Sequence, residues 1–266
     1  MPQNAGRKLV EAIRKLIEKI IYFCTVENVS PNLAVHEMRK SFKRLQALLR
    51  FYIVFAEKFS AEYSLQISDY RRMLSIMRES FVNIQIFDRI SSNNNLISER
   101  KIKSAKEKLL EKNKAIIENG FLNVQGYQSI HRFIEVLDGQ VGKIEIERPS
   151  QHQLVGQLVD SYRQAYDCYQ QIRPDSIAEE KHNLRKKLKR LWYQFDFIKY
   201  LHPRFFRLKS DQLNKITEQL GEDHDLYVFL NEIKQNKTDF SASEVEIIEN
   251  QVKHLREINM LKLFPR

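Results

Sequence analysis

Apolar residues recur at intervals of three and four along almost the whole of this 266-residue chain. Because an α-helix turns by about 100° per residue, this spacing gathers them on one helical face. Glycine and proline, which the turns of a sheet-rich fold need in number, occur only 7 and 6 times. The sequence therefore predicts an all-α fold, with helices at about 4–26, 32–58, 66–90, 98–119, 150–171, 176–201, 208–235 and 241–261.

The helical pattern weakens near the middle of the chain, where Gly120, Gly126, Gly139 and Gly142 make up four of the seven glycines. Part of this stretch still follows a helical pattern. Residues 141–147 alternate between apolar and polar, as in a β-strand, but a single strand would have no other strand to pair with. We predict a single domain in three parts: a first helical repeat at 1–120, a connector at 121–149 with one short helix at most, and a second helical repeat at 150–266.

Two segments at an offset of 146 residues share a basic motif. Residues 36–45 (HEMRKSFKRL) align without a gap with residues 182–191 (HNLRKKLKRL), and six of the ten positions are identical. A shared apolar period explains the common leucine but not the common His, Arg and Lys residues. The match therefore predicts an internal duplication.

On a helical wheel, the cations of each motif share one stripe, opposite an apolar face. Cations of like sign lie four residues apart, and each such pair costs about 0.2–0.5 kcal/mol. A solvated basic face, or pairing with acids on neighbouring helices, would also accommodate one stripe. Two copies, each beginning with histidine, favour an anion site. The predicted ligand contacts are His36, Arg39, Lys40, Lys43, Arg44 and Arg50 in the first copy and His182, Arg185, Lys186, Lys189 and Arg190 in the second.

A second pair of segments aligns at the same offset, namely 74–82 (LSIMRESFV) and 220–228 (LGEDHDLYV). We expect Arg78 and His224 to extend the basic site, and the acids that follow them, Glu79 and Asp225, to orient nearby Arg or Lys side chains. Asp223, His224 and Asp225 are consecutive on a helix and point in different directions, so we predict no metal site.

The formal charge of +10 and the pI of about 9.4 indicate an anionic partner, but they do not choose between nucleic acid, an acidic membrane and another polyanion. Cys24 and Cys168 lack the spacing of a zinc site and are expected to be free thiols in a reducing compartment. No apolar run approaches the roughly 20 residues that span a bilayer. We therefore expect a cytoplasmic protein.

The doubled His-x-x-Arg-x-x-x-Lys-Arg-Leu motif, together with Leu220-Gly221 and Asp225-Leu226, resembles the CHAD family, the conserved histidine α-helical domain. The resemblance covers nearly the whole chain. It implies two four-helix bundles related by a pseudo-twofold axis, with a positively charged pore or groove between them that binds inorganic polyphosphate. Association with polyphosphate granules is a further expectation.

The chain also departs from the family pattern. Gln46 and Trp192 stand where the family often has another arginine, and the first repeat has Ser75 and Glu79 where the second has Gly221 and Asp225. One flank of the site should therefore be less charged. Nothing resembles the triphosphate-tunnel β-barrel that many relatives carry, so the chain looks like a stand-alone version.

Nucleic acid is the alternative ligand, because its phosphate backbone would satisfy the same cations. Base recognition needs polar and aromatic side chains between the cations. The stripe offers only Tyr193 and, at its edge, Trp192, which favours a ligand without bases. The sequence has no Gly-rich phosphate loop and no Gly-x-Ser-x-Gly or His-Glu-x-x-His motif, so we predict a binding protein without a cofactor rather than an enzyme.

Overall fold

The computed structural model describes residues 5–52, 57–92, 96–122, 126–144, 150–235 and 240–263, and within these ranges every regular element is a helix. The first half contains α1 (Ala5–Thr25), α2 (Pro31–Leu49), the 3-10 turn η1 (Arg50–Tyr52), α3 (Glu57–Ser91), α4 (Glu99–Ile117) and the π-helical turn η2 (Glu118–Leu122). The second half contains α6 (Gln151–Gln171), α7 (Ala178–Ile198), α8 (Pro203–Gln235) and α9 (Ala242–Leu263), and α5 (Gly126–Ile144) lies between the halves. The predicted all-α class is confirmed.

Three predicted helix boundaries were wrong. α2 ends at Leu49, and α3 begins at Glu57 rather than near residue 66. No glycine or proline lies between residues 50 and 66, so the sequence gives no local sign of the break. α8 begins at Pro203, ahead of the predicted start near 208. Proline suits the first turn of a helix, because its missing N–H has no intrahelical partner there.

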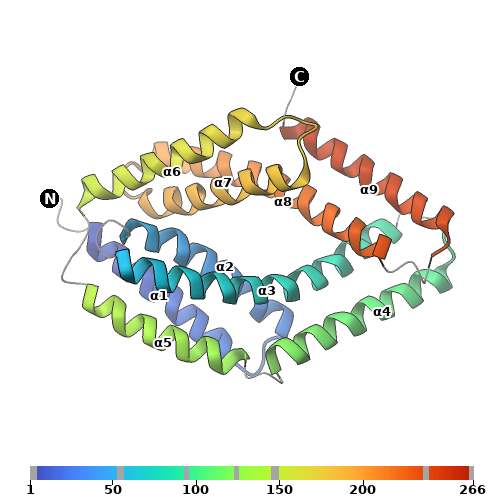
Figure 1. Ribbon diagram of the computed structural model, residues 1–266, viewed down its shortest axis with the longest axis horizontal. Helices are drawn as coiled ribbons and strands as arrows, with labels where there is room; N and C mark the ends of the chain where they lie inside the picture. Colours follow the sequence, from blue (N-terminus) through green and yellow to red (C-terminus); the bar gives the residue numbers. More distant parts are fainter. Residues whose placement is uncertain are drawn as a thin grey trace.

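The connector holds more structure than predicted. α5 is a helix of 19 residues, and it packs against α1. The first part of the alternating segment, Val141 to Ile144, belongs to this helix, and residues 145–149 lie outside the described part of the chain. In Figure 1 α5 lies beside α1 on the side away from the second half.

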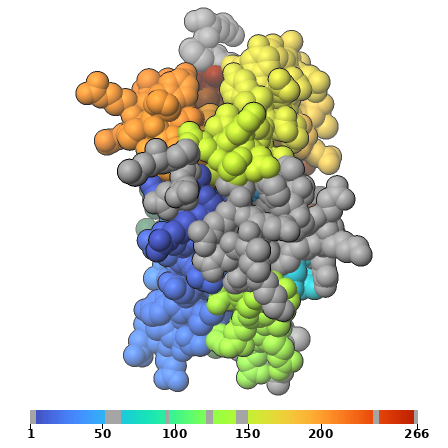
Figure 2. All heavy atoms as spheres, turned by 90° about the vertical axis from the view of Figure 1, so that its left-hand side faces the viewer, coloured from blue at the N-terminus to red at the C-terminus, as the bar shows by residue number. Residues whose placement is uncertain are grey.

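The helices of each half pack in chain order, α1 on α2 on α3 on α4 and α6 on α7 on α8 on α9. The halves meet where α2 packs against α7 and α3 against α8. Figure 1 shows the first half, in blue to green, below the second half, in yellow to red. The end view of Figure 2 agrees, with α1, α2 and α5 below and α6 and α8 above.

The apolar faces of the two motif helices form part of one core. Met38, Phe42 and Leu45 on α2 are fully buried, and they share a cluster with Leu184 and Leu188 on α7. A second cluster joins the ends of α3 and α8 to α4 and α9. Both clusters combine residues from the two halves. Since burial fixes the apolar face of each motif helix, it also fixes the direction in which the cations point.

Both cysteines are free, as expected; Cys24 is half-buried and Cys168 is buried. Within the described part of the chain, no helix is long and apolar enough to cross a membrane.

Candidate functional site

A cavity of about 470 Å³ lies between α2, α3, α7 and α8, and its walls come from both halves of the chain. Nine of the thirteen predicted site residues line it: Arg39, Lys43, Arg50, His182, Arg185, Lys186, Lys189, Arg190 and His224. Four do not, namely His36, Lys40, Arg44 and Arg78. The two cationic stripes thus face a common space, because the α2–α7 contact turns them towards each other.

The arginines at the third position after each motif histidine are held in related ways. Arg39 donates from Nε to Oγ of Ser75, 3.0 Å away. Arg185 donates from Nε to the backbone carbonyl of Thr217 at 3.4 Å, and its guanidinium lies against Gly221, where a Cβ would come within 2.8 Å of it. Ser75 and Gly221 are themselves aligned at the offset of 146 residues. Each arginine is therefore positioned by the same turn of its neighbouring helix.

Arg39 and Arg185 line the same cavity, and burial, followed by the charge of Arg185, lowers the pKa of Arg39 to about 10. Glu79 and Asp225 act in the opposite direction on this pKa. Burial raises the pKa of Asp225, but a hydrogen bond from His224 and the charges of Arg185 and Arg39 outweigh it, so that the pKa is lowered overall. One carboxylate from each half therefore acts electrostatically on the arginine pair.

Lys43 is surrounded by cations. Its pKa is held well below its ordinary value, first by burial and then by Arg39, Arg185, Arg71 and Lys189. An ammonium group buried among like charges is costly, and a bound anion would reduce that cost.

Lys189 is in a similar position on α7. Burial and the charge of Arg185 lower its pKa to about 8, and its Nζ lies 3.9 Å from the centroid of the Trp192 ring. Such cation–π contacts stabilise an ammonium group without supplying a counter-ion. The lining of the cavity therefore has excess positive charge that its own acids leave uncompensated.

His182 stacks on His224, with ring centroids 4.3 Å apart. Burial, and then the neighbouring His224, Lys186 and Arg185, lower the pKa of His182 to about 3. Its Nδ1 is buried and has no hydrogen-bond partner among the described residues. In the absence of an anion this imidazole is consequently neutral at physiological pH.

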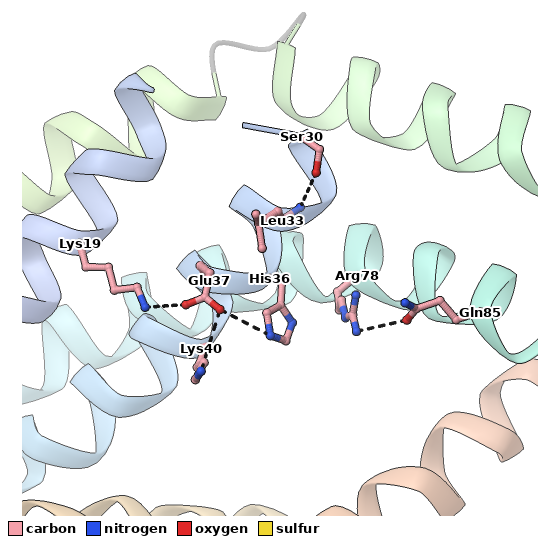
Figure 3. Close-up of polar contacts among 8 residues, drawn as sticks. All are labelled: Lys19, Ser30, Leu33, His36, Glu37, Lys40, Arg78 and Gln85. Atoms are coloured by element: carbon pink, nitrogen blue, oxygen red, sulfur yellow. Dashed lines mark hydrogen bonds and ion pairs between the residues drawn. The ribbon is translucent and has the colours of Figure 1, made fainter. Parts of the chain in front are cut away.

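His36, the counterpart of His182, lies outside the cavity lining. Figure 3 shows it beside Arg78, which occupies the position equivalent to His224. Burial and the charge of Arg78 lower its pKa, whereas Glu37, whose Oε1 is 3.7 Å from Nε2 of His36, raises it. The first half thus pairs histidine with arginine where the second half pairs two histidines.

Lys40 and Arg44 have acidic neighbours. Lys40 Nζ lies 3.9 Å from Oε1 of Glu37, and Arg44 lies 3.9 Å from Oδ2 of Asp196 on α7. Arg44 is therefore paired with an acid on a neighbouring helix, which was the alternative to an anion site, and Lys40 is paired with an acid on its own helix. Glu37 lies within the motif on the same helix, whereas Asp196 comes from the other half, so only the tertiary structure shows the second pairing.

The structure adds two arginines that the sequence motif did not identify. Arg71 and Arg72 on α3 line the cavity, and Arg71 donates to Oε1 of Gln46. Arg71 lies one helical turn before Ser75, which lies one turn before Glu79, so one face of α3 points at the cavity. Comparison of the two repeats could not identify Arg71 and Arg72, because Thr217 and Glu218 stand at the equivalent positions in the second half.

Asp223 has a partner of its own, whereas His224 and Asp225 contact each other, with Nδ1 and Oδ1 3.3 Å apart. Asp223 accepts two hydrogen bonds from Arg256, at 2.7 and 3.2 Å, whereas His224 stacks on His182. Within the described ranges, no group of three His, Cys, Asp or Glu side chains is arranged to hold a metal ion.

Comparisons with known proteins identify the family and the fold. The sequence matches the CHAD domain over residues 11–234, and the chain belongs to this family. The fold is similar to the CHAD domain from the plant Ricinus communis, with a TM-score of 0.69, 18% identity, and coverage of 98% of this chain and 87% of that one. It is also similar to PptA from Streptomyces chartreusis, with a TM-score of 0.71, 11% identity and 97% coverage of both chains. No curated protein matches the sequence.

Proposed function

We propose that this protein binds inorganic polyphosphate in the cavity between α2, α3, α7 and α8. The observation that carries the proposal is the convergence of Arg39 and Lys43 from one half with Arg185 and Lys189 from the other in one cavity of about 470 Å³. Among the described residues that line it, Glu79 is the only acid. Polyphosphate is a linear chain with a negative charge on each phosphate and no bases to accommodate. The CHAD resemblance points to the same ligand.

The chemistry of the lining suits phosphoryl oxygens. Arginine presents a planar fork of donors to two oxygens at once, and lysine adds a mobile point charge. Burial and repulsion between cations lower the pKa values of Lys43 and Lys189. A polyanion that enters the cavity offsets this repulsion and stabilises the charged form of both side chains.

We propose binding without chemical change. The lining consists mainly of Arg and Lys groups with some hydroxyl, amide and imidazole groups, and its carboxylate, Glu79, raises the pKa of Arg39. The proposal needs no cofactor. It includes a cytoplasmic location and association with polyphosphate granules.

We further propose that α1–α4 and α6–α9 are duplicated four-helix units related by a pseudo-twofold axis, which would place the cavity at that axis. The equivalent contacts of Arg39 with Ser75 and of Arg185 with Gly221 support this relationship. So do the equivalent pairs formed by the motif histidines. The two units would share their cores, since both apolar clusters contain residues from each half.

A binding competition at fixed salt tests the ligand. Labelled long-chain polyphosphate should be displaced by unlabelled polyphosphate at much lower phosphate concentration than by single-stranded DNA, RNA or short oligophosphates. Its affinity should fall linearly on a plot of log affinity against log salt, by analogy with counterion release from nucleic acids. Equal displacement by DNA or RNA would contradict the proposal and indicate a nucleic-acid-binding protein.

Charge reversal tests the site. We expect Arg39→Glu combined with Arg185→Glu to weaken polyphosphate binding by at least about a hundredfold, because it puts two carboxylates in the ligand's path. The control is Arg100→Glu with Lys103→Glu, which makes the same change of net charge at exposed positions on α4. If both double variants lose affinity equally while circular dichroism is unchanged, overall charge and not the cavity binds the ligand.

A further inference from the structure

One face of α6 carries a row of exposed apolar side chains. Val155, Val159, Tyr162, Tyr166 and Tyr169 are 40%, 39%, 50%, 49% and 44% exposed. They follow one another at intervals of four, three, four and three residues. We call these five residues the α6 seam. This spacing is the one that two helices use when they pack along their length, and the seam runs beside the buried stripe that faces α7.

Helix α6 is well formed independently of this face. It begins with a capping box, in which the Ser150 hydroxyl accepts from the Gln153 amide and the Gln153 side chain accepts from the Ser150 amide. Tyr162 and Tyr166 stack on consecutive turns, with centroids 6.0 Å apart and ring planes at 14°. The seam is therefore a rigid surface, whose rings lose little freedom when a partner covers them.

The first half of the molecule shows how such a face is covered. α1 precedes α2 as α6 precedes α7, but α1 is packed on two sides, by α2 and by α5. Ile13, Ile17 and Ile20 of α1 are fully buried and share a cluster with Ile134 and Leu137 of α5. Within the described part of the chain, no helix covers α6 in this way (Figure 1). A helix is therefore the element that fits there.

We infer that the α6 seam binds the α6 seam of a second copy of this chain. The charge distribution favours that occupant. The chain has a net charge of +10, so its copies repel each other across most faces. Residues 151–171 contain only Asp160, Arg163 and Asp167 as charged residues besides one histidine. An acidic partner would find a single cation here, Arg163, flanked by Asp160 and Asp167, whereas two nearly neutral seams can meet about a twofold axis and pair like with like.

The area limits how strong this association can be. Five half-exposed side chains leave roughly 400 Å² per copy, since an aromatic side chain has about 150–250 Å² to bury. Two copies would bury roughly 800 Å², below the ~1,200 Å² of a stable interface. The expected dimer is therefore weak and reversible, and its population depends on protein concentration.

Sedimentation equilibrium of the full chain over a wide range of concentrations tests this inference. The wild type should show a monomer–dimer equilibrium in the absence of polyphosphate. The equilibrium should persist in high salt, because burial of apolar surface is not screened, whereas two copies bridged by a polyanion would separate. A wild type that stays monomeric at every concentration, or a dimer that dissociates in high salt, overturns the inference.

Variants locate the interface. Tyr162→Asp with Tyr166→Asp should raise the dissociation constant by roughly tenfold or more, since aromatic anchors dominate such contacts. Tyr22→Asp is the control, an exposed tyrosine on α1 outside the seam. Tyr162→Gln with Tyr166→Gln repeats the test without added charge and guards against unfolding. A dimer that both seam variants leave intact, or that Tyr22→Asp disrupts to the same extent, is formed by another surface and overturns the inference.

Discussion

His182 on α7 and His224 on α8 stack within the cationic cavity, with ring centroids 4.3 Å apart and ring planes inclined by 26°. Burial, and then the neighbouring His224 and cations, lower the pKa of His182 to about 3 and keep this ring neutral. The histidine that begins each motif is therefore not simply one more positive charge. In the second half it is a neutral group that would gain a proton only when an anion enters the cavity.

From the low pKa of His182 we predict that the folded protein loses stability in acid. Since the pKa of folded His182, about 3, lies below its ordinary value of 6.5, the folded state binds fewer protons between these values. The free energy of unfolding should thus fall as the pH drops from about 6.5 towards about 3, and bound polyphosphate should reduce the loss by raising the pKa. Thermal denaturation over this range should show a shallower decline in His182→Gln than in the wild type or in the exposed control His152→Gln. Parallel declines would exclude His182 as the cause.

Lys43 should stabilise the complex and destabilise the free protein. We expect Lys43→Met to raise the stability of the ligand-free protein by roughly 1 kcal/mol, or about 2–4 °C in Tm, because it removes a buried cation from among four others. The same variant should bind polyphosphate several-fold more weakly. Calorimetry and a binding titration on one preparation check both signs. A loss of stability would mean that Lys43 is already compensated without ligand.

Gly221 should affect polyphosphate binding by leaving room for the Arg185 side chain. A Cβ at this position would lie 2.8 Å from the guanidinium, so Gly221→Ala must displace that side chain and should weaken polyphosphate binding several-fold. Its stability should not fall, since alanine favours a helix over glycine by about 1 kcal/mol. Gly139→Ala on α5 is the matched control, because a Cβ there meets nothing within 4 Å. Unchanged affinity in Gly221→Ala would show that the observed position of Arg185 is not required.

Arg71 and Arg44 separate the structural assignment from the sequence motif. Arg71 lies in the cavity lining but outside the motif, whereas Arg44 lies in the motif but beside Asp196, outside the lining. Arg71→Gln should therefore reduce polyphosphate affinity, and the slope of log affinity against log salt, more than Arg44→Gln does. Titrations at several salt concentrations measure both quantities. A larger loss of affinity in Arg44→Gln would mean that the ligand contacts the cations predicted from the helical wheel rather than those that line the cavity.

Arg39→Lys combined with Arg185→Lys tests geometry at constant charge. We expect a lower affinity with a nearly unchanged salt slope, because lysine keeps the charge but lacks the fork that engages two phosphoryl oxygens. Competition assays against the wild type at several salt concentrations provide the comparison. Full retention of affinity would mean that the cavity binds by charge alone.

The sequence alone predicted most of the helices and the buried face of each motif helix. Both follow from local periodicity, since apolar spacing fixes which side of a helix is turned inward, as the burial of Met38 and Leu184 confirms. The same reasoning extended α2 too far, to residue 58 rather than Leu49, because no glycine or proline marks its end.

Which cations reach the cavity was decided only by the tertiary structure. A helical wheel gives the angle of a side chain around its own helix, but not which other helix lies in that direction. The packing of α2 on α7 and of α3 on α8 brought Arg71 into the lining, left Arg44 beside Asp196, and separated His36 from the cavity while keeping His182 within it. The repeat makes the two motifs equivalent in sequence, whereas their neighbours differ. The environment of each charge therefore comes from contacts between residues far apart in the chain.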